Sequence, residues 1–218
     1  MLSQSHFNEF IYFLIDRLKQ ELPGQHAHLK LAPKQDGKPF RGFKPPDDAR
    51  KSAVLAILSE NKLNNDIDLL FTLRSSELDS HSGQISFPGG RQELGETPEQ
   101  NALRETYEEI GIPSEYFKVI GKLTELYVPP SKSVISPIVA FIEEFPDLKI
   151  NSFEVEDVFK LTLTELSHPD SIKTEIWNFQ GQDIEVPLWR LYPRAPLWGA
   201  TAIMVSELIE LYKEFIIR

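Results

Sequence analysis

Six glutamates and two arginines lie within one short segment, FPGGRQELGETPEQNALRETYEEIGI, at residues 87–112. Carboxylates at this density can act as general acids and bases, or as hard oxygen ligands for a divalent cation. Three of them, Glu105, Glu108 and Glu109, would share one face of a helix within an arc of about 100°. Like charges at these spacings destabilise a helix by about 0.2–0.5 kcal/mol per pair. The segment therefore indicates either a bound cation or a solvated acidic helix face.

A helix is expected over residues 98–110. Thr97 is a favoured N-cap, Pro98 a favoured first helical residue, and Gln100 completes a capping box. Gly111 supplies a left-handed C-terminal stop. The buried stripe of this helix is expected to consist of Ala102, Leu103, Thr106 and Ile110.

The spacing of the charged and glycine residues resembles the Nudix box, the signature of hydrolases that cleave a diphosphate linked to another group. One position departs, because the family prefers an aliphatic residue where Thr106 stands. Its hydroxyl is expected to bond to the carbonyl of Ala102, so the site should be kept. The matching pattern is Gly90, five residues, Glu96, seven residues, Arg104-Glu105, two residues, Glu108-Glu109, one residue, Gly111 and Ile112.

The resemblance implies an α/β fold, a Nudix-type α/β/α sandwich with a mixed sheet, that binds Mg²⁺ or Mn²⁺. By position, Glu105 and Glu109 would be the main metal ligands, and Glu108 would contribute directly or through water. Arg104 would belong to the catalytic set and, with Glu96, would orient the ligands. Gly89 and Gly90 would let the backbone turn sharply and approach the substrate closely.

The stretch LLFTLRSSELDSHSGQISFPGG, residues 69–90, resembles the extra motif of the coenzyme A pyrophosphatase subfamily. Arg74 is kept and is a candidate phosphate ligand, although an ordinary strand-end arginine is the alternative. Leu78-Asp79 stands where the subfamily usually carries an arginine, and an acidic residue cannot pair with a phosphate. His81 is expected to be a loop residue that forms hydrogen bonds. Downstream, LYVPPSKSVISPIVAF, EVEDVFKLTLTEL and PLWGATA are also similar, so the likeness covers most of residues 49–218.

The leading hypothesis is metal-dependent cleavage of coenzyme A or acyl-coenzyme A to 4′-phosphopantetheine and adenosine 3′,5′-bisphosphate. ADP-ribose, dinucleotides and nucleoside triphosphates remain alternative substrates. Candidates for the general base are Glu108 and, from outside the box, Glu154 or Glu156. Exposed positions on an edge strand are the alternative for Glu154 and Glu156. Aromatic residues that either line a base pocket or only pack in the fold are Tyr127, Trp177, Trp189 and Trp198.

Two other classes of protein are alternatives to an enzyme. A non-catalytic nucleotide-binding regulator with the same fold would commonly lack box glutamates, whereas Glu105, Glu108 and Glu109 are all present. A structural protein with an acidic helix would require the glycine and arginine positions to be coincidental. The pattern therefore favours a hydrolase.

The elements that position these residues are expected to form one domain over residues 49–218, with an extension at residues 1–48. The chain has 218 residues, of which 41% are apolar and 26% charged, as in soluble globular proteins. Residues 22–48 hold five prolines and predict an extended connection. An amphipathic helix precedes it, with Phe7, Phe10, Ile11, Leu14 and Leu18 at helical spacing.

Strands and a final helix are expected in the remainder. SAVLAIL and DIDLLFTL, residues 52–58 and 66–73, flank an Asn-rich turn and predict a hairpin. Alternating apolar residues predict strands within 116–126, 134–142 and 154–163, and residues 199–218 have a helical pattern. Such elements favour a sheet covered by helices.

The composition excludes several partners and sites. The formal net charge of −10 argues against nucleic acid and anionic membranes as partners. With no cysteine, the chain has no thiolate nucleophile and no Cys-ligated zinc. The apolar run FIYFLI is too short to span a bilayer, so a cytoplasmic location is expected. Because relatives are often homodimers, a homodimer is expected, with the first helix covering its own sheet or a second copy.

Overall fold

The structure, a computed structural model, describes residues 5–40, 42, 44–77 and 82–218. Its helices are α1 (His6–Arg17), α2 (Gly24–Leu31), α3 (Pro98–Ile110), α4 (Leu163–Ser167) and α5 (Gly199–Ile216), with 3-10 turns at Ser114–Tyr116 and Pro129–Ser131. Its strands are β1 (Lys34–Gln35), β2 (Lys38–Pro39), β3 (Arg50–Asn61), β4 (Asp66–Arg74), β5 (Ile85–Ser86), β6 (Gly89–Arg91), β7 (Lys118–Lys122), β8 (Leu126–Val128), β9 (Ser133–Ile142), β10 (Val155–Thr162), β11 (Ile172–Phe179), β12 (Gln182–Trp189) and β13 (Leu197–Trp198).

A mixed sheet is the centre of the molecule. Its main order is β10-β4-β3-β9-β7, and the short strands β5, β6 and β8 pair with β4, β3 and β9. β3 and β9 run parallel, whereas β3 and β4 form the predicted antiparallel hairpin. The predicted strands within residues 116–126, 134–142 and 154–163 are confirmed as β7, β9 and β10, with the start of β8.

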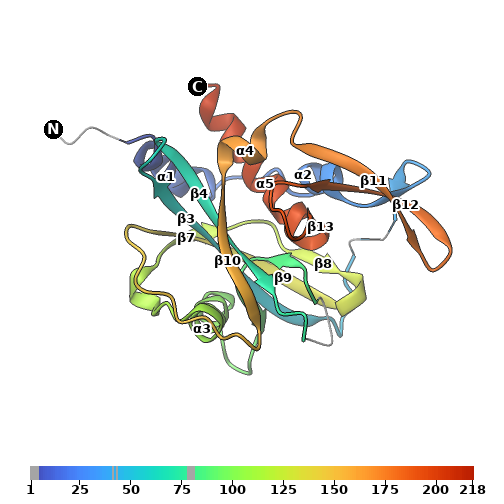
Figure 1. The fold of residues 1–218 in the computed structure, drawn as a ribbon, viewed down its shortest axis with the longest axis horizontal. Coiled ribbons are helices and arrows are strands. Elements are labelled where there is room, and N and C mark those ends of the chain that lie inside the picture. Colours follow the sequence, from blue (N-terminus) through green and yellow to red (C-terminus); the bar gives the residue numbers. More distant parts are fainter. Residues whose placement is uncertain (1–4, 41, 43, 78–81) are drawn as a thin grey trace.

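Alternating side chains of β3 build two cores, one on each face of this sheet. Leu55 and Ile57 pack on the face covered by α3, whereas Val54, Ala56 and Leu58 pack on the face covered by α1 and α5. Such a strand is apolar on both faces because both are covered by helices. Figure 1 shows α3 on one side of the sheet and α1 and α5 on the other. The predicted α/β/α sandwich with a mixed sheet is confirmed.

A second, smaller sheet stands beside α5. Its order is β11-β12-β1-β2, with β13 paired to β12. The buried residues Ile184, Val186 and Leu188 of β12 form a separate small core. Partly buried aromatic and apolar side chains packed against it are Phe40, Trp177, Phe179 and Trp198.

Helix α1 packs on the domain itself. Phe7, Phe10, Ile11 and Leu14 are buried in the same core as α5 and one face of the large sheet. Ser5 caps the helix by accepting a hydrogen bond from Asn8 N–H at 3.3 Å. The predicted amphipathic helix is confirmed, and of its two proposed roles the structure supports covering its own sheet.

The extended connection predicted for residues 22–48 is wrong where α2 forms. An isolated helix of eight residues is marginal in water, so its sequence gives little signal. Tertiary contacts stabilise α2 instead: Ala27, His28 and Leu31 are buried. The backbone N–H of Gly24 also donates to the carboxylate of Glu207 on α5 at 2.7 Å.

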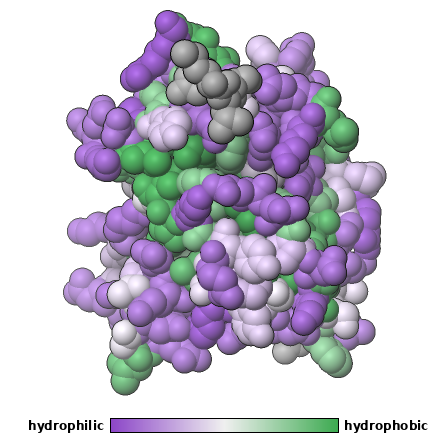
Figure 2. All heavy atoms as spheres, turned by 90° about the vertical axis from the view of Figure 1, so that its left-hand side faces the viewer, coloured by the Kyte–Doolittle hydropathy of each residue, from purple (hydrophilic) through white to green (hydrophobic). Residues whose placement is uncertain are grey.

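The face at the left of Figure 1 is mostly polar. On the side at the left of Figure 1, hydrophilic side chains dominate, and hydrophobic ones gather in a band across the upper half (Figure 2). Among the described residues, no helix combines the length and the hydropathy needed to cross a bilayer.

Candidate active site

Helix α3 carries most of the predicted site residues and has the predicted bounds. Thr97 accepts from Gln100 N–H at 3.2 Å and Gln100 Oε1 accepts from Thr97 N–H at 2.9 Å, which confirms the capping box. Gly111 ends the helix with φ of 74°. Thr106 donates its hydroxyl to the carbonyl of Ala102 at 2.7 Å, as expected, so its polar group is satisfied inside the core.

Two glycines bring β6 against β3 and α3. A Cβ on Gly89, whose φ is 151°, would lie 2.4 Å from the carbonyl oxygen of Ala53. A Cβ on Gly90 would lie 2.4 Å from the carboxylate of Glu105. Gly89 therefore needs glycine, because its φ is positive and a Cβ would meet backbone atoms. A side chain at Gly90 would instead displace the carboxylate of Glu105, which lies directly against this backbone position.

Glu109 is the most buried of the acidic side chains on α3, with 1% of its surface exposed. Its Oε2 accepts from the backbone N–H of Gly89 at 3.3 Å, and its Oε1 lies 3.5 Å from Nη1 of Arg74. Burial raises the pKa of Glu109 to about 8, although the charge of Arg74 opposes this rise. The carboxylate therefore lacks enough positive charge around it to compensate for its burial.

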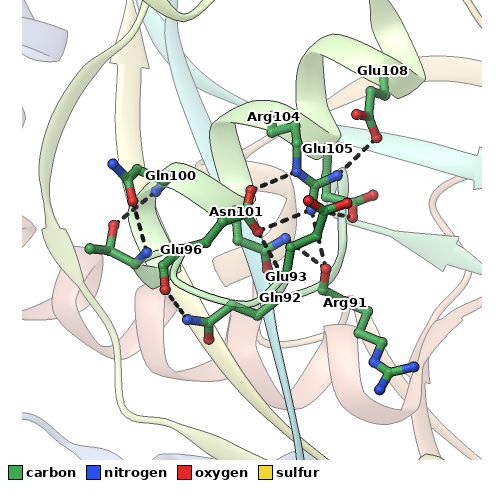
Figure 3. A network of polar contacts seen from close by, with 10 residues as sticks. Arg91, Gln92, Glu93, Glu96, Gln100, Asn101, Arg104, Glu105 and Glu108 are labelled. Carbon is green, nitrogen blue, oxygen red and sulfur yellow. Dashed lines mark hydrogen bonds and ion pairs between the residues drawn. The ribbon is translucent and has the colours of Figure 1, made fainter.

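Arg104 gathers three other carboxylates. It donates from Nε to Glu96 at 2.7 Å and from Nη1 to Glu108 at 2.9 Å, and its Nη2 lies 3.0 Å from Glu105. Figure 3 shows the guanidinium among these groups, with a further bond to the carbonyl of Arg91. The bond from Arg104 holds the pKa of Glu96 below its usual value. This network is consistent with the prediction that Arg104 and Glu96 orient the metal ligands, which stays a prediction.

Glu105 interacts both with the Arg104 network and with Glu109. Burial raises the pKa of its carboxyl, while Arg104 opposes the rise and the charges of Glu108 and Glu154 add to it. The negative charge of Glu105 also contributes to the raised pKa of Glu109. Glu105 and Glu109 are thus close enough to destabilise each other as anions.

Glu154 joins this cluster from outside α3. Its charge raises the pKa of both Glu105 and Glu109. Asn151 donates to Glu154 Oε1 at 3.0 Å and fixes the side chain just before β10. By contrast, Glu156 pairs with Arg194. Of the two glutamates considered as outside bases, the structure brings only Glu154 to the site.

The donor set fits a hard divalent cation. Among the described residues, no group of three or more His, Asp or Glu side chains is already arranged to hold a metal ion. Arg104 pairs with two of the candidate ligands, Glu105 and Glu108, so a cation would have to draw Glu105 away from it. Burial and repulsion disfavour the charged forms of Glu105 and Glu109, and a cation bound by their oxygens would remove that penalty.

A pocket of about 610 Å³ lies beside this cluster and is lined by Gly89, Gly90 and Arg74. Arg74 Nε is buried and has no hydrogen-bond partner among the described residues. A buried donor without a partner is costly, so an acceptor from a ligand would stabilise it. Arg74 thus connects the pocket to Glu109.

The aromatic candidates divide between this pocket and the fold. Tyr127 and Trp198 line the pocket. Trp177 packs edge-on against Trp198, with ring centroids 4.7 Å apart. Trp189 is 1% exposed and donates to the carbonyl of Leu166 at 3.1 Å, so its role is packing. The predictions for Asp79 and His81 fall outside the described residues.

Sequence reasoning missed several residues of the site. Asn151 lies in the loop before β10 and has no local signal that links it to Glu154. Phe40 and Phe179 line the pocket from segments far apart in the chain. Only their aromatic character could have suggested a binding wall, and that character is equally typical of a core.

Comparisons with known proteins identify the family of this chain. The family model described as NUDIX domain matches residues 49–179, which is more than half of the chain. Nudix hydrolase 3 of Caenorhabditis elegans is 29% identical over 184 residues, covering 76% of this chain and 75% of the worm protein. The peroxisomal coenzyme A diphosphatase NUDT7 of Mus musculus is 33% identical over 102 residues, but the match spans only 46% of this chain and 43% of the mouse protein.

A solved structure supports the fold. The crystal structure of the Nudix hydrolase RenU from M. smegmatis has a TM-score of 0.51 and 17% identity, covering 79% of this chain and 96% of that one. At this identity the likeness concerns the fold alone.

Proposed function

The chain belongs to the Nudix family and is therefore a hydrolase of nucleotide derivatives, and we propose that its substrate is coenzyme A or acyl-coenzyme A. Hydrolysis of the diphosphate would release 4′-phosphopantetheine and adenosine 3′,5′-bisphosphate. Two observations support this substrate: the likeness of residues 69–90 to the coenzyme A pyrophosphatase motif, and the partial match to the mouse coenzyme A diphosphatase.

The observation that carries the proposed reaction is that the buried Glu109 and the partly buried Glu105 lie beside a pocket. We assign both as ligands of Mg²⁺ or Mn²⁺, with Glu108 contributing directly or through water. Enzymes of this family use divalent cations, and when bound such an ion neutralises the diphosphate oxygens and polarises the phosphorus. Gly89 and Gly90 lack side chains, and their role is to let the backbone lie close to the substrate and the carboxylates.

Arg74 and Arg104 have different roles in this proposal. Arg74 binds the diphosphate, because its buried Nε needs an acceptor and its guanidinium lines the pocket. Arg104, with Glu96, holds the outer side of α3 in place. Glu154 takes the proton of the attacking water, since Asn151 fixes it beside Glu105 and Glu109 and no arginine pairs with it among the described residues.

We also propose that residues 49–218 form the hydrolase domain and residues 1–48 its extension, in a cytoplasmic homodimer. The burial of α1 in the domain's own core means that its apolar face is not the dimer contact. Sedimentation of the full chain would give the assembly, and a monomer at all concentrations would contradict this part.

The test is a substrate panel with chromatographic separation of products. Coenzyme A, acyl-coenzyme A, ADP-ribose, a dinucleotide and a nucleoside triphosphate are each incubated with Mg²⁺, with Mn²⁺ and with a chelator. Metal-dependent release of 4′-phosphopantetheine is expected to be fastest from the coenzyme A compounds. Preference for another substrate would replace coenzyme A, unchanged turnover after exhaustive chelation would contradict metal dependence, and failure on all five would favour a binding module.

A further inference from the structure

The pocket beside the carboxylates extends well beyond the space that a diphosphate needs. Its volume is about 610 Å³, and sites that enclose a whole organic ligand typically measure about 300–1,000 Å³. Its lining includes Arg74 and Gly90 beside the carboxylates, residues of the α5 face of the large sheet, and aromatic residues packed against the small core of β12.

The floor of this pocket is apolar. Its side chains come from β3, β5, β8 and α5 and from the residue after β5, and each has 9% or less of its surface exposed. These floor residues are Val54, Ile85, Phe87, Leu126, Ile203 and Met204.

The wall of this pocket is aromatic and comes from three distant segments. Phe40 follows β2, Phe179 ends β11, and Trp198 ends β13. Phe40 and Trp198 lie outside residues 49–179, which match the NUDIX domain model. Two of the three wall residues therefore come from outside the segment that the family model matches.

The charges of the pocket are confined to arginine. Among the described lining residues the only charged side chains are Arg74 and Arg91, and none is acidic, although the chain as a whole has a net charge of −10. Arg91 gives its carbonyl to the Arg104 network, while its guanidinium points away from that network (Figure 3). The pocket thus accepts negative charge at the arginines and offers an uncharged apolar surface elsewhere.

A substrate with two charged ends would fit this pocket poorly, because a phosphate placed on the apolar floor would lose its hydration without gaining a partner. We propose that the pocket binds the uncharged arm attached to the diphosphate, an acylated pantetheine, with the acyl chain against Ile203 and Met204. The inference rests on the proposed hydrolase function and adds to it a preference for acylated over free coenzyme A. Each methylene that the floor buries is expected to strengthen binding about fourfold.

Binding to the full chain tests this without turnover. The probes are 4′-phosphopantetheine and its S-butyryl and S-octanoyl thioesters, titrated calorimetrically. Affinity should rise at least tenfold from the free thiol to the octanoyl thioester. The Ala200→Phe variant, which adds bulk to a half-buried lining position on α5, should lose most of that gain. The Ile176→Phe variant is the matched control, because Ile176 is 63% exposed on β11 and does not line the pocket.

A second variant guards against misfolding of the first. Met204→Ala enlarges the floor and should shift the preferred acyl chain to a longer one. Equal affinities for all three probes in the wild type, or an unchanged gain in both lining variants, would overturn the inference. If the thioesters bind as expected but no diphosphate is hydrolysed, the proposed function fails while the binding of the arm stands. If the diphosphate is hydrolysed but the three probes bind with equal affinity, the proposed function stands and the binding of the arm fails.

Discussion

Two glutamates are almost fully buried, Glu109 at 1% and Glu207 at 0% exposure, and they differ in what surrounds them. Glu207 accepts from Gly24 N–H at 2.7 Å, from Thr124 N–H at 3.0 Å and from the Thr124 hydroxyl at 2.7 Å. His28 Nε2 lies 3.3 Å away. Burial alone would raise the pKa of Glu207, but these hydrogen bonds hold it below its usual value.

Glu109 has far less support. Among the described residues, it receives one backbone hydrogen bond from Gly89 and a longer contact with Arg74. Its pKa is raised to about 8 by the same burial that hydrogen bonds offset at Glu207. The hydrogen bonds of Glu207 connect α2 and Thr124 to α5 and satisfy its carboxylate, so its role is structural. Glu109 lacks such partners, as expected of the cation ligand that we propose.

The largest effect is expected at Glu109. Glu109→Gln should lower turnover about 10³-fold, because a neutral amide is a poor ligand for a hard cation and the charge stabilisation is lost. The fold should persist, since the change removes a poorly compensated buried charge. Turnover by chromatography and a thermal melt measure the two results. A variant that keeps its activity, or one that unfolds, would remove the contrast with Glu207.

Glu207→Gln should lower stability and leave activity unchanged, which is the reverse of the effect expected for Glu109→Gln. Replacing the carboxylate weakens the bonds from Gly24, Thr124 and His28 and should lower the free energy of unfolding by about 3 kcal/mol. Activity per folded molecule should remain, which urea denaturation and turnover together would establish. The matched control is Glu210→Gln on the same helix, because Glu210 pairs with Lys30 of α2 at a partly exposed position. That pair should contribute less than about 1 kcal/mol.

A third test compares Glu154 and Glu156, which lie two residues apart in the sequence. Glu154→Gln should lower kcat about 10²-fold if its carboxylate takes the proton of water. Glu156→Gln should have little effect on kcat, because Glu156 pairs with Arg194 at the surface. Equal rates for the two variants would contradict the role proposed for Glu154.

The smallest effect expected is an opposite pH dependence of stability. The pKa of Glu109 rises from 4.5 to about 8 on folding, so its contribution is full below pH 4.5 and is lost as the pH rises through about 8. The pKa of Glu207 falls, so its contribution is present above 4.5 and is lost as the pH falls through the folded value.

Thermal melts of the metal-free protein between about pH 5 and about pH 9 would measure the first slope. The wild type should lose several degrees relative to Glu109→Gln across this range, and Mg²⁺ should reduce the loss. Parallel curves for the two proteins would mean that Glu109 is not held in its protonated form by burial.

Local features of the site could be predicted because they depend on neighbours in the chain. The capping box joins Thr97 to Gln100, and the hydroxyl of Thr106 bonds to the carbonyl of Ala102, so each contact spans at most four residues. Together with Gly111, these local features explain why the bounds of α3 could be predicted. Helix α2 could not, because its stability comes from Glu207 and from burial on α5 rather than from its own eight residues.

The carboxylate spacing of α3, the glycines before it and the layered fold follow from residues close together in the chain, since helix periodicity, capping and backbone sterics act over a few residues. The packing of distant elements decided which glutamate is buried with few partners, that Glu154 joins the cluster and that Arg74 lies beside Glu109. It also decided that segments as distant as Phe40 and Met204 line one pocket. Such contacts depend on how whole elements pack, because burial and the field of distant charges exist only once the chain has folded.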